Sequence, residues 1–120
     1  MIMQTAFRYD DATVTGFRLE DGVIHLDLEC CTERDDIAVD VSLAFRRIEN
    51  LQVENRPADQ LDMREDDGEI ISYMKTEHRA EIVIQWNHFG PTERRREMVA
   101  YKFDFASFEL TRSDDILRTS

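Results

Sequence analysis

Hydrophobic and polar residues alternate with a period of two along most of the chain. The clearest run covers residues 23–31, where the apolar residues of one parity are Ile24, Leu26, Leu28 and Cys30. A period of two sends successive side chains to opposite faces of a strand. The pattern therefore predicts an antiparallel strand with one buried face and one face towards solvent.

A hairpin is predicted between this strand and a preceding one over residues 13–20. The link is Glu20-Asp21-Gly22. Asp-Gly between two alternating runs is a strong hairpin signal, because Gly accepts a positive φ without steric cost. Gly16 is predicted to mark a β-bulge, since Val14 is out of step with the next apolar residue, Phe17.

The next strand is predicted over residues 37–45, where five apolar residues share one parity. Arg46 and Arg47 end the alternation. We expect a bend at these arginines, followed by a short strand over residues 51–54.

Three further strands are predicted over residues 69–76, 79–89 and 97–105. A tight turn at Glu77-His78 joins the first two. The second carries Trp86 on the same parity as its isoleucines, so Trp86 is expected in the core.

Two segments lack a strong strand pattern. In residues 57–66, Pro57 suits the first turn of a short helix, although a loop explains the segment equally well. In residues 107–118, Ser113 is a helix N-cap candidate before acidic residues. We therefore expect short helical or irregular segments in both places.

Together these elements predict a mainly β fold of six to seven meandering strands, as an antiparallel β-sandwich or a curved sheet. A length of 120 residues predicts a single β-rich domain over 1–120.

The charge balance limits the classes of partner. The chain has 15 Lys and Arg against 26 Asp and Glu, for a formal net charge of −11. Nucleic-acid affinity comes mainly from cations that neutralise phosphates. We therefore expect no nucleic acid and no membrane as partner, and a basic protein as the partner that long-range electrostatics favours.

The two cysteines, Cys30 and Cys31, are adjacent, which argues against a disulfide framework. The first residues show no basic region followed by an apolar core, as a signal peptide would. A cytoplasmic, bacterial protein is the simplest interpretation.

The stretch Gln85 to Glu97, "QWNHFGPTERRRE", combines aromatic residues with three arginines, a mixture that can stack bases. However, Glu93 and Glu97 flank the arginines, and neighbouring strand residues point to opposite faces. A solvated hairpin tip is the favoured interpretation, and a binding surface is the alternative.

An acidic segment is the most distinctive feature of the composition, with a single cation, Arg64, among its acids. A solvated loop, a surface for a basic protein and a cation site are the three interpretations. The candidate partner surface consists of Asp59, Asp62, Glu65, Asp66, Asp67 and Glu69.

The sequence contains no phosphate-binding Gly-rich loop, nucleophilic Ser motif or paired Cys motif. We therefore assign no catalytic, cofactor or metal residue and expect a non-enzymatic protein. The alternative is a small-molecule module or enzyme with a pocket between sheet layers. Its rim would consist of Trp86, His88, Phe89 and Tyr101. Open sheet edges also make a homodimer an alternative.

The stretches "YDDATVTGFRLEDGVIHLDLEC", "VSLAFRRIENLQV" and "FDFASFEL" resemble, in their order of features, small β-rich bacterial proteins of the polymorphic-toxin immunity type. In that group the opening motif commonly carries His-Asp-Ala, where this chain has Asp10-Asp11-Ala12. The resemblance implies a non-enzymatic protein that binds and blocks a partner, and it carries over no functional residue.

Overall fold

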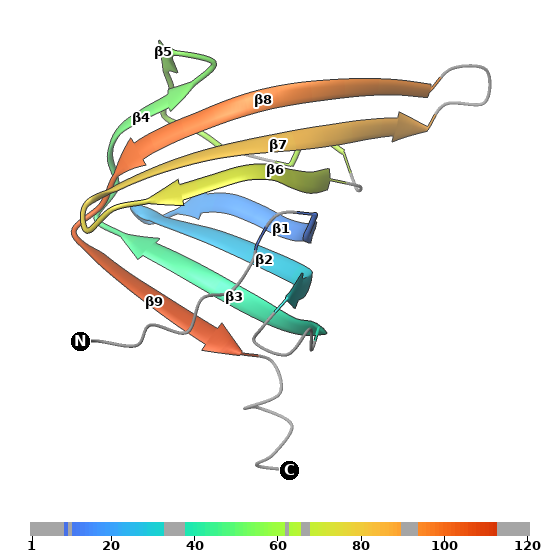
Figure 1. Cartoon of the computed structure of the whole chain (residues 1–120). Helices are drawn as coiled ribbons and strands as arrows, with labels where there is room; N and C mark the ends of the chain where they lie inside the picture. The colour runs from blue at the N-terminus through green and yellow to red at the C-terminus, as the bar shows by residue number, and fades with distance from the viewer. Residues whose placement is uncertain are drawn as a thin grey trace.

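The computed structural model describes residues 9, 11–32, 38–61, 63–65, 68–89 and 94–112. Within these residues one antiparallel sheet of nine strands bends over its own core, in the order β5-β4-β8-β7-β6-β1-β2-β3-β9 (Figure 1). The mainly β prediction is confirmed, and the single bent sheet matches the curved-sheet alternative. The strands are β1 (Thr13–Glu20), β2 (Val23–Thr32), β3 (Ala38–Arg46), β4 (Glu49–Val53), β5 (Arg56–Pro57), β6 (Gly68–Lys75), β7 (Arg79–Phe89), β8 (Arg94–Asp104) and β9 (Ser107–Arg112).

The β1–β2 hairpin forms where the sequence predicts it. Asp21 and Gly22 connect the strands with φ values of 52° and 75°. Positive φ at both central residues is typical of the primed turns that match the twist of a hairpin. The predicted bulge is also present, because the β1–β2 register shifts between Val14 and Gly16.

The sheet bends at a corner where two long strands turn together. β3 runs into β4 through Arg47 and Ile48, and β8 runs into β9 through Phe105 and Ala106. Arg46 pairs with Ser107 on one side of the corner, and Glu49 pairs with Asp104 on the other. The second pair lies three residues later on one strand and three residues earlier on the other, so the register does not shift. The predicted bend after Arg46 is therefore the point where a paired ribbon crosses between the halves of the sheet.

The two halves of the bent sheet face each other across the core (Figure 1). One half holds β4 to β8, and the other holds β1, β2, β3 and β9. Aromatic rings join them. Phe17 of β1 meets Tyr101 of β8 edge-on at 4.8 Å between ring centroids, and Phe45 of β3 meets Phe103 of β8 at 5.0 Å. Burial on one parity of each long strand thus builds one shared core.

The predicted count of six to seven strands is wrong, and the helical alternative for the two weakly patterned segments finds no support in the described residues. The described residues contain nine strands and no helix. In the 57–66 segment, Pro57 belongs to β5, the Ala58 N–H donates to the Leu51 carbonyl, and the Leu61 carbonyl accepts from the Leu19 N–H. These backbone groups form hydrogen bonds with residues of β4 and β1 and not within a helical turn.

The second segment, 107–118, begins as a strand. β9 extends the ladder of β3, with Phe108 opposite Phe45 and Leu110 opposite Leu43. Its period of two, apolar at 108 and 110, fits this strand. Ser113 lies outside the described residues. The described part of the chain also has no helix with the length and hydrophobicity needed to cross a lipid bilayer.

Candidate functional site

Three of the six acids of the candidate partner surface lie in the part of the chain that the structure describes. Asp59 is exposed in the loop after β5, Glu65 is half-buried, and Glu69 lies on β6 opposite Gln85. Asp62, Asp66 and Asp67 lie outside the described residues. Among described residues no group of three or more His, Cys, Asp or Glu side chains is placed to hold a metal ion.

Trp86 and Tyr101 lie in the core. The Trp86 Nε1–H donates to the Tyr101 hydroxyl at 2.9 Å, and both residues are buried. Burial raises the pKa of the Tyr101 phenol, while the Trp86 hydrogen bond acts in the opposite direction. The core position predicted for Trp86 is confirmed. His88 and Phe89 belong to the end of β7, and their side chains lie outside the described part of the structure.

A glycine on the neighbouring strand makes room for Trp86. A Cβ on Gly68 would lie 2.6 Å from Cζ3 and 2.7 Å from Cε3 of the indole ring. The indole ring of Trp86 therefore lies against the backbone of its cross-strand partner Gly68 on β6.

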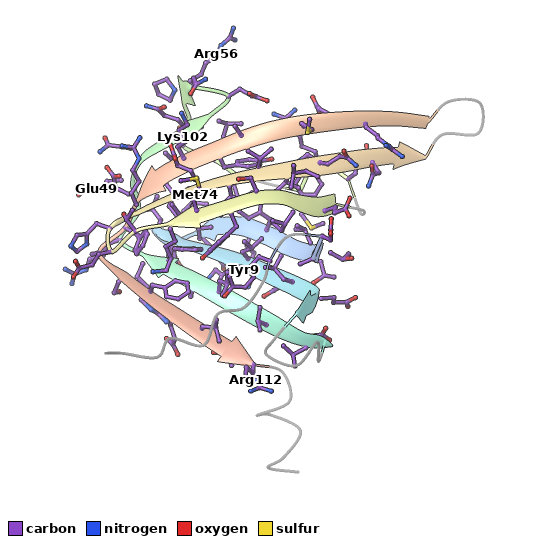
Figure 2. All side chains as sticks on the ribbon, in the orientation of Figure 1. Tyr9, Glu49, Arg56, Met74, Lys102 and Arg112 are labelled. Atoms are coloured by element: carbon purple, nitrogen blue, oxygen red, sulfur yellow. The ribbon has the colours of Figure 1, made fainter. Side chains whose placement is uncertain are left out.

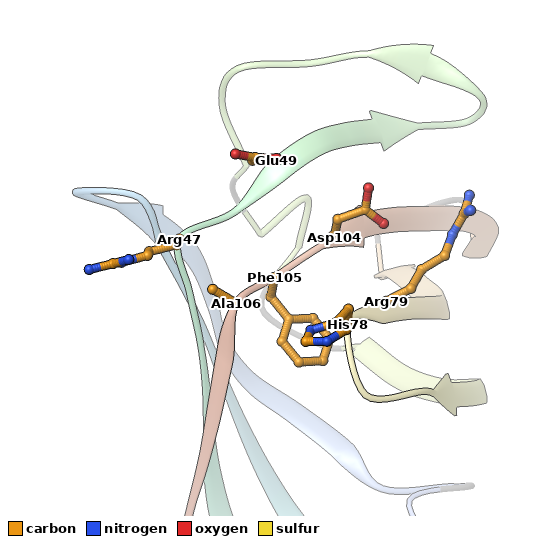
Figure 3. A pocket seen from close by; sticks show the side chains of 7 residues that line it. All are labelled: Arg47, Glu49, His78, Arg79, Asp104, Phe105 and Ala106. Atoms are coloured by element: carbon orange, nitrogen blue, oxygen red, sulfur yellow. The ribbon is translucent and has the colours of Figure 1, made fainter.

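A cavity of about 550 Å³ opens at the corner of the sheet (Figure 3). Phe105 contributes an aromatic wall, with charged side chains of both signs and His78 around it. Arg47 holds a left-handed backbone with φ of 56°, an uncommon conformation for a residue of its type. In Figure 3 the side chain of Arg47 points away from the other charged groups. The lining residues are Arg47, Glu49, His78, Arg79, Asp104, Phe105 and Ala106.

Hydrogen bonds fix part of this cavity. The Asn50 Nδ2 donates to Asp104 Oδ2 at 2.8 Å, and the backbone of Phe105 donates to the His78 carbonyl at 2.9 Å. A second cavity, of about 360 Å³, lies beside the β1–β2 turn and includes Asp59 in its wall. Trp86 and Tyr101 line neither of these two cavities.

The outer face of β6, β7 and β8 carries exposed apolar side chains. Ile71 is 40% exposed, Met74 62% and Met98 58%. On the central strand β7, Met74 pairs with Glu81 and Met98 with Gln85, and Val83 between them pairs with Ala100 of β8. We call these five residues the methionine face: Ile71, Met74, Val83, Met98 and Ala100. Figure 2 shows Met74 on this half, with Lys102 labelled on β8, on the other side of β7.

The other outer face, on β1, β2, β3 and β9, is charged. Arg18 Nη1 lies 3.8 Å from Asp27 Oδ2, and Arg46 Nη2 lies 3.2 Å from Glu109 Oε2. No large hydrophobic side chain among the described residues is exposed on these four strands. We call this surface the charged face.

Sequence reasoning missed the methionine face. The available signal was Met98, which alternates with the inward Val99 and so occupies a parity that solvent-facing residues usually fill. On β6, the register shift between Ile70 and Ser72 hid the outward position of Ile71.

No model of a known protein family matches the chain, and neither a curated protein nor a solved structure matches it.

Proposed function

We propose that this protein is a non-enzymatic binding domain whose methionine face docks a basic partner protein. The observation that carries the proposal is the exposure of Ile71, Met74 and Met98 on one sheet face of a highly charged chain. Exposed apolar side chains that cluster and are rimmed by polar residues are typical of interaction surfaces.

The composition of the face suits protein recognition. Methionine is flexible and polarisable, so it adapts to an irregular partner surface. The ion pair between Lys102 Nζ and Glu81 Oε1, 3.8 Å apart, stands at the edge of the face. An apolar centre with a polar rim is the usual anatomy of a protein interface.

The net charge of −11 supports a basic partner. An acidic domain attracts a basic protein over a distance set by the ionic strength, and this attraction speeds encounter. The resemblance to immunity proteins supports a blocking role, in which the domain covers the working surface of that partner.

The proposal is tested by affinity capture with matched baits at low and high salt. The baits are the wild-type chain, the Met74→Gln/Met98→Gln variant and a control, Ser42→Gln, which changes the charged face. We expect one basic protein that the wild type and the control capture, that the double variant loses, and that elutes as salt rises.

Two outcomes of the capture experiment would contradict the proposal. A captured protein that binds the double variant as well as the control does not use the methionine face. Capture that does not weaken with salt contradicts the electrostatic part of the proposal.

A second candidate function is the binding of a small zwitterion in the corner cavity. It is supported by the cavity walls, which bring both signs of charge to an aromatic side chain, Phe105. Free amino acids are the probes. We expect a rise in melting temperature that Arg79→Gln abolishes, and unchanged melting of the wild type with every amino acid would reject this candidate.

A further inference from the structure

The two edges of the sheet differ in how they are protected. At one edge, β5 has only two residues, one of them Pro57. Short length and proline are two of the ways in which natural proteins keep an edge strand from pairing with another chain.

β9, at the other edge, has none of these features. It runs for six residues without proline and pairs with β3 without a register shift, from Arg46–Ser107 to Val41–Arg112. In the described residues no strand pairs with the opposite side of β9. Its backbone groups on that side can therefore pair with an added strand.

We propose that β9 pairs antiparallel with β9 of a second copy of this chain, about a twofold axis perpendicular to the sheet. Such an axis places the outer face of one copy beside the outer face of the other. Residues that stand opposite each other must therefore share the same parity. Two symmetric registers of useful length meet this condition, one centred on Glu109 and one centred on Leu110.

Charge selects between the two registers. Centring on Glu109 sets this carboxylate opposite its own copy, and like charges directly opposite destabilise a sheet. Centring on Leu110 sets Leu110 opposite itself and Glu109 opposite Thr111. It also sets Phe108 opposite Arg112, where a guanidinium can lie against an aromatic ring. The strand is thus complementary to itself in the second register.

The side chains of β9 also suit pairing with a second copy of the same strand. Phe108, Leu110 and Arg112, which share the inward parity, are only half-buried. A neighbouring strand would cover more of their surface. The six residues of β9 carry one acid, Glu109, and one base, Arg112, so the net charge of the strand is zero. A second copy of β9 therefore adds no net charge at the edge.

This dimer is independent of the partner proposed above. Three strands, β1, β2 and β3, separate β9 from the methionine face in the sheet order. The salt dependence also has the opposite sign. Each copy carries −11, so salt screens the repulsion between copies and strengthens the dimer, while it weakens capture of a basic protein.

Sedimentation velocity of the full chain at 50 and 500 mM sodium chloride tests the dimer. We expect a concentration-dependent dimer that tightens as salt rises. Thr111→Glu places one carboxylate opposite each Glu109, which makes two repelling pairs in the dimer, and we expect it to raise the dissociation constant about tenfold. Thr111→Lys places a cation there, and we expect a lower dissociation constant.

Ser42 offers a matched control, because it pairs with Thr111 in the same row of the sheet but lies one strand inside the edge. Ser42→Glu and Ser42→Lys change the net charge equally, and we expect dissociation constants near that of the wild type. Circular dichroism checks that every variant is folded. A chain that stays monomeric at both salt concentrations overturns the proposal, as do equal effects at positions 42 and 111.

Discussion

The two outer faces of the bent sheet cover one core but have different surfaces. The charged face contains the ion pairs of Arg18 with Asp27 and Arg46 with Glu109. The methionine face exposes more than half of Met74 and of Met98. Both faces belong to antiparallel strands whose other side is buried, so packing in the core demands apolar residues on neither.

This difference shows that the fold does not require the exposed apolar side chains of the methionine face. The charged face demonstrates that the same architecture is compatible with a polar exterior. The exposed surface of an apolar side chain contributes nothing to the stability of the folded state until a partner covers it. Among the described residues, exposed large apolar side chains occur on one face and not on the other, which is the reason for assigning binding to the methionine face.

The largest expected effects concern the interior that the two faces share. Phe45 belongs to the half with the charged face, and Trp86 to the half with the methionine face. Each is fully buried, at 0% exposed. We expect Phe45→Ala and Trp86→Ala each to lower the free energy of unfolding by about 3–5 kcal/mol, measured by urea denaturation. A small loss for one and a large loss for the other would show that the halves have separate cores.

Alanine substitutions at two glycines, one in each half of the sheet, have the next largest expected effect on stability. A Cβ on Gly68 would lie 2.6 Å from the Trp86 ring, and a Cβ on Gly16 would lie 2.5 Å from Asp27 Oδ2. The ring is buried and cannot move, whereas the Asp27 carboxylate is at the surface and can rotate. We expect Gly68→Ala to cost about 1–3 kcal/mol and Gly16→Ala less than about 1 kcal/mol.

Thermal and urea unfolding of both glycine variants measure this difference. Because the clash distances are nearly equal, equal losses would mean that the surface around Asp27 is as rigid as the core.

Tyr73 on β6 provides a smaller effect that depends on pH. Its hydroxyl is buried without a hydrogen bond to any described residue, and its ring lies 4.4 Å from that of Tyr9. Burial, with Tyr9 adding to it, raises the pKa of this phenol far above its usual range. We expect Tyr73→Phe to raise the free energy of unfolding by about 1 kcal/mol, because it removes an unsatisfied polar group.

The sign of the pH effect follows from the raised pKa. The unfolded chain loses the Tyr73 proton above about pH 10, while the folded chain keeps it. The stabilising contribution is therefore complete below that pH and is lost as the pH rises further, by about 1.4 kcal/mol per pH unit. Tyr73→Phe removes this slope, which urea denaturation between pH 9 and 11 measures. An unchanged slope would show that the phenol is ionised in the folded chain.

The smallest effects on stability occur on the outer faces themselves. The Arg46–Glu109 ion pair is 50% and 61% exposed at its side chains, so solvent screens it. We expect Arg46→Gln and the Met74→Gln/Met98→Gln variant each to change the free energy of unfolding by less than about 0.5 kcal/mol. The two variants should then differ only in partner capture. A large loss of stability in the methionine variant would mean that its side chains support the fold.

Local pattern predicted much of this fold. The β1–β2 hairpin follows from Asp21-Gly22, the bulge from Gly16, and the buried position of Trp86 from its parity with its neighbours. Each depends on residues close in sequence. The period of two is a property of single strands, so it identifies strands well.

Features that depend on distant residues were not predictable in the same way. β9 is a strand because β3, more than sixty residues earlier, offers it an edge. Pro57 lies in a two-residue strand because Gln52 pairs with it. The corner cavity contains Glu49 and Asp104 because the β3–β4 and β8–β9 ribbons bend together.

The order in which the ribosome makes these strands leaves β3 without one of its two neighbours during synthesis. β3 emerges early, but its second neighbour, β9, is the last of the described strands to be made. During the interval β3 is an open edge that carries Val41, Leu43 and Phe45. Pairing of distant segments is slow, and exposed hydrophobic edges are prone to aggregation. Nascent chains that end before β9 should therefore need chaperones most, and completion of β9 should end that dependence.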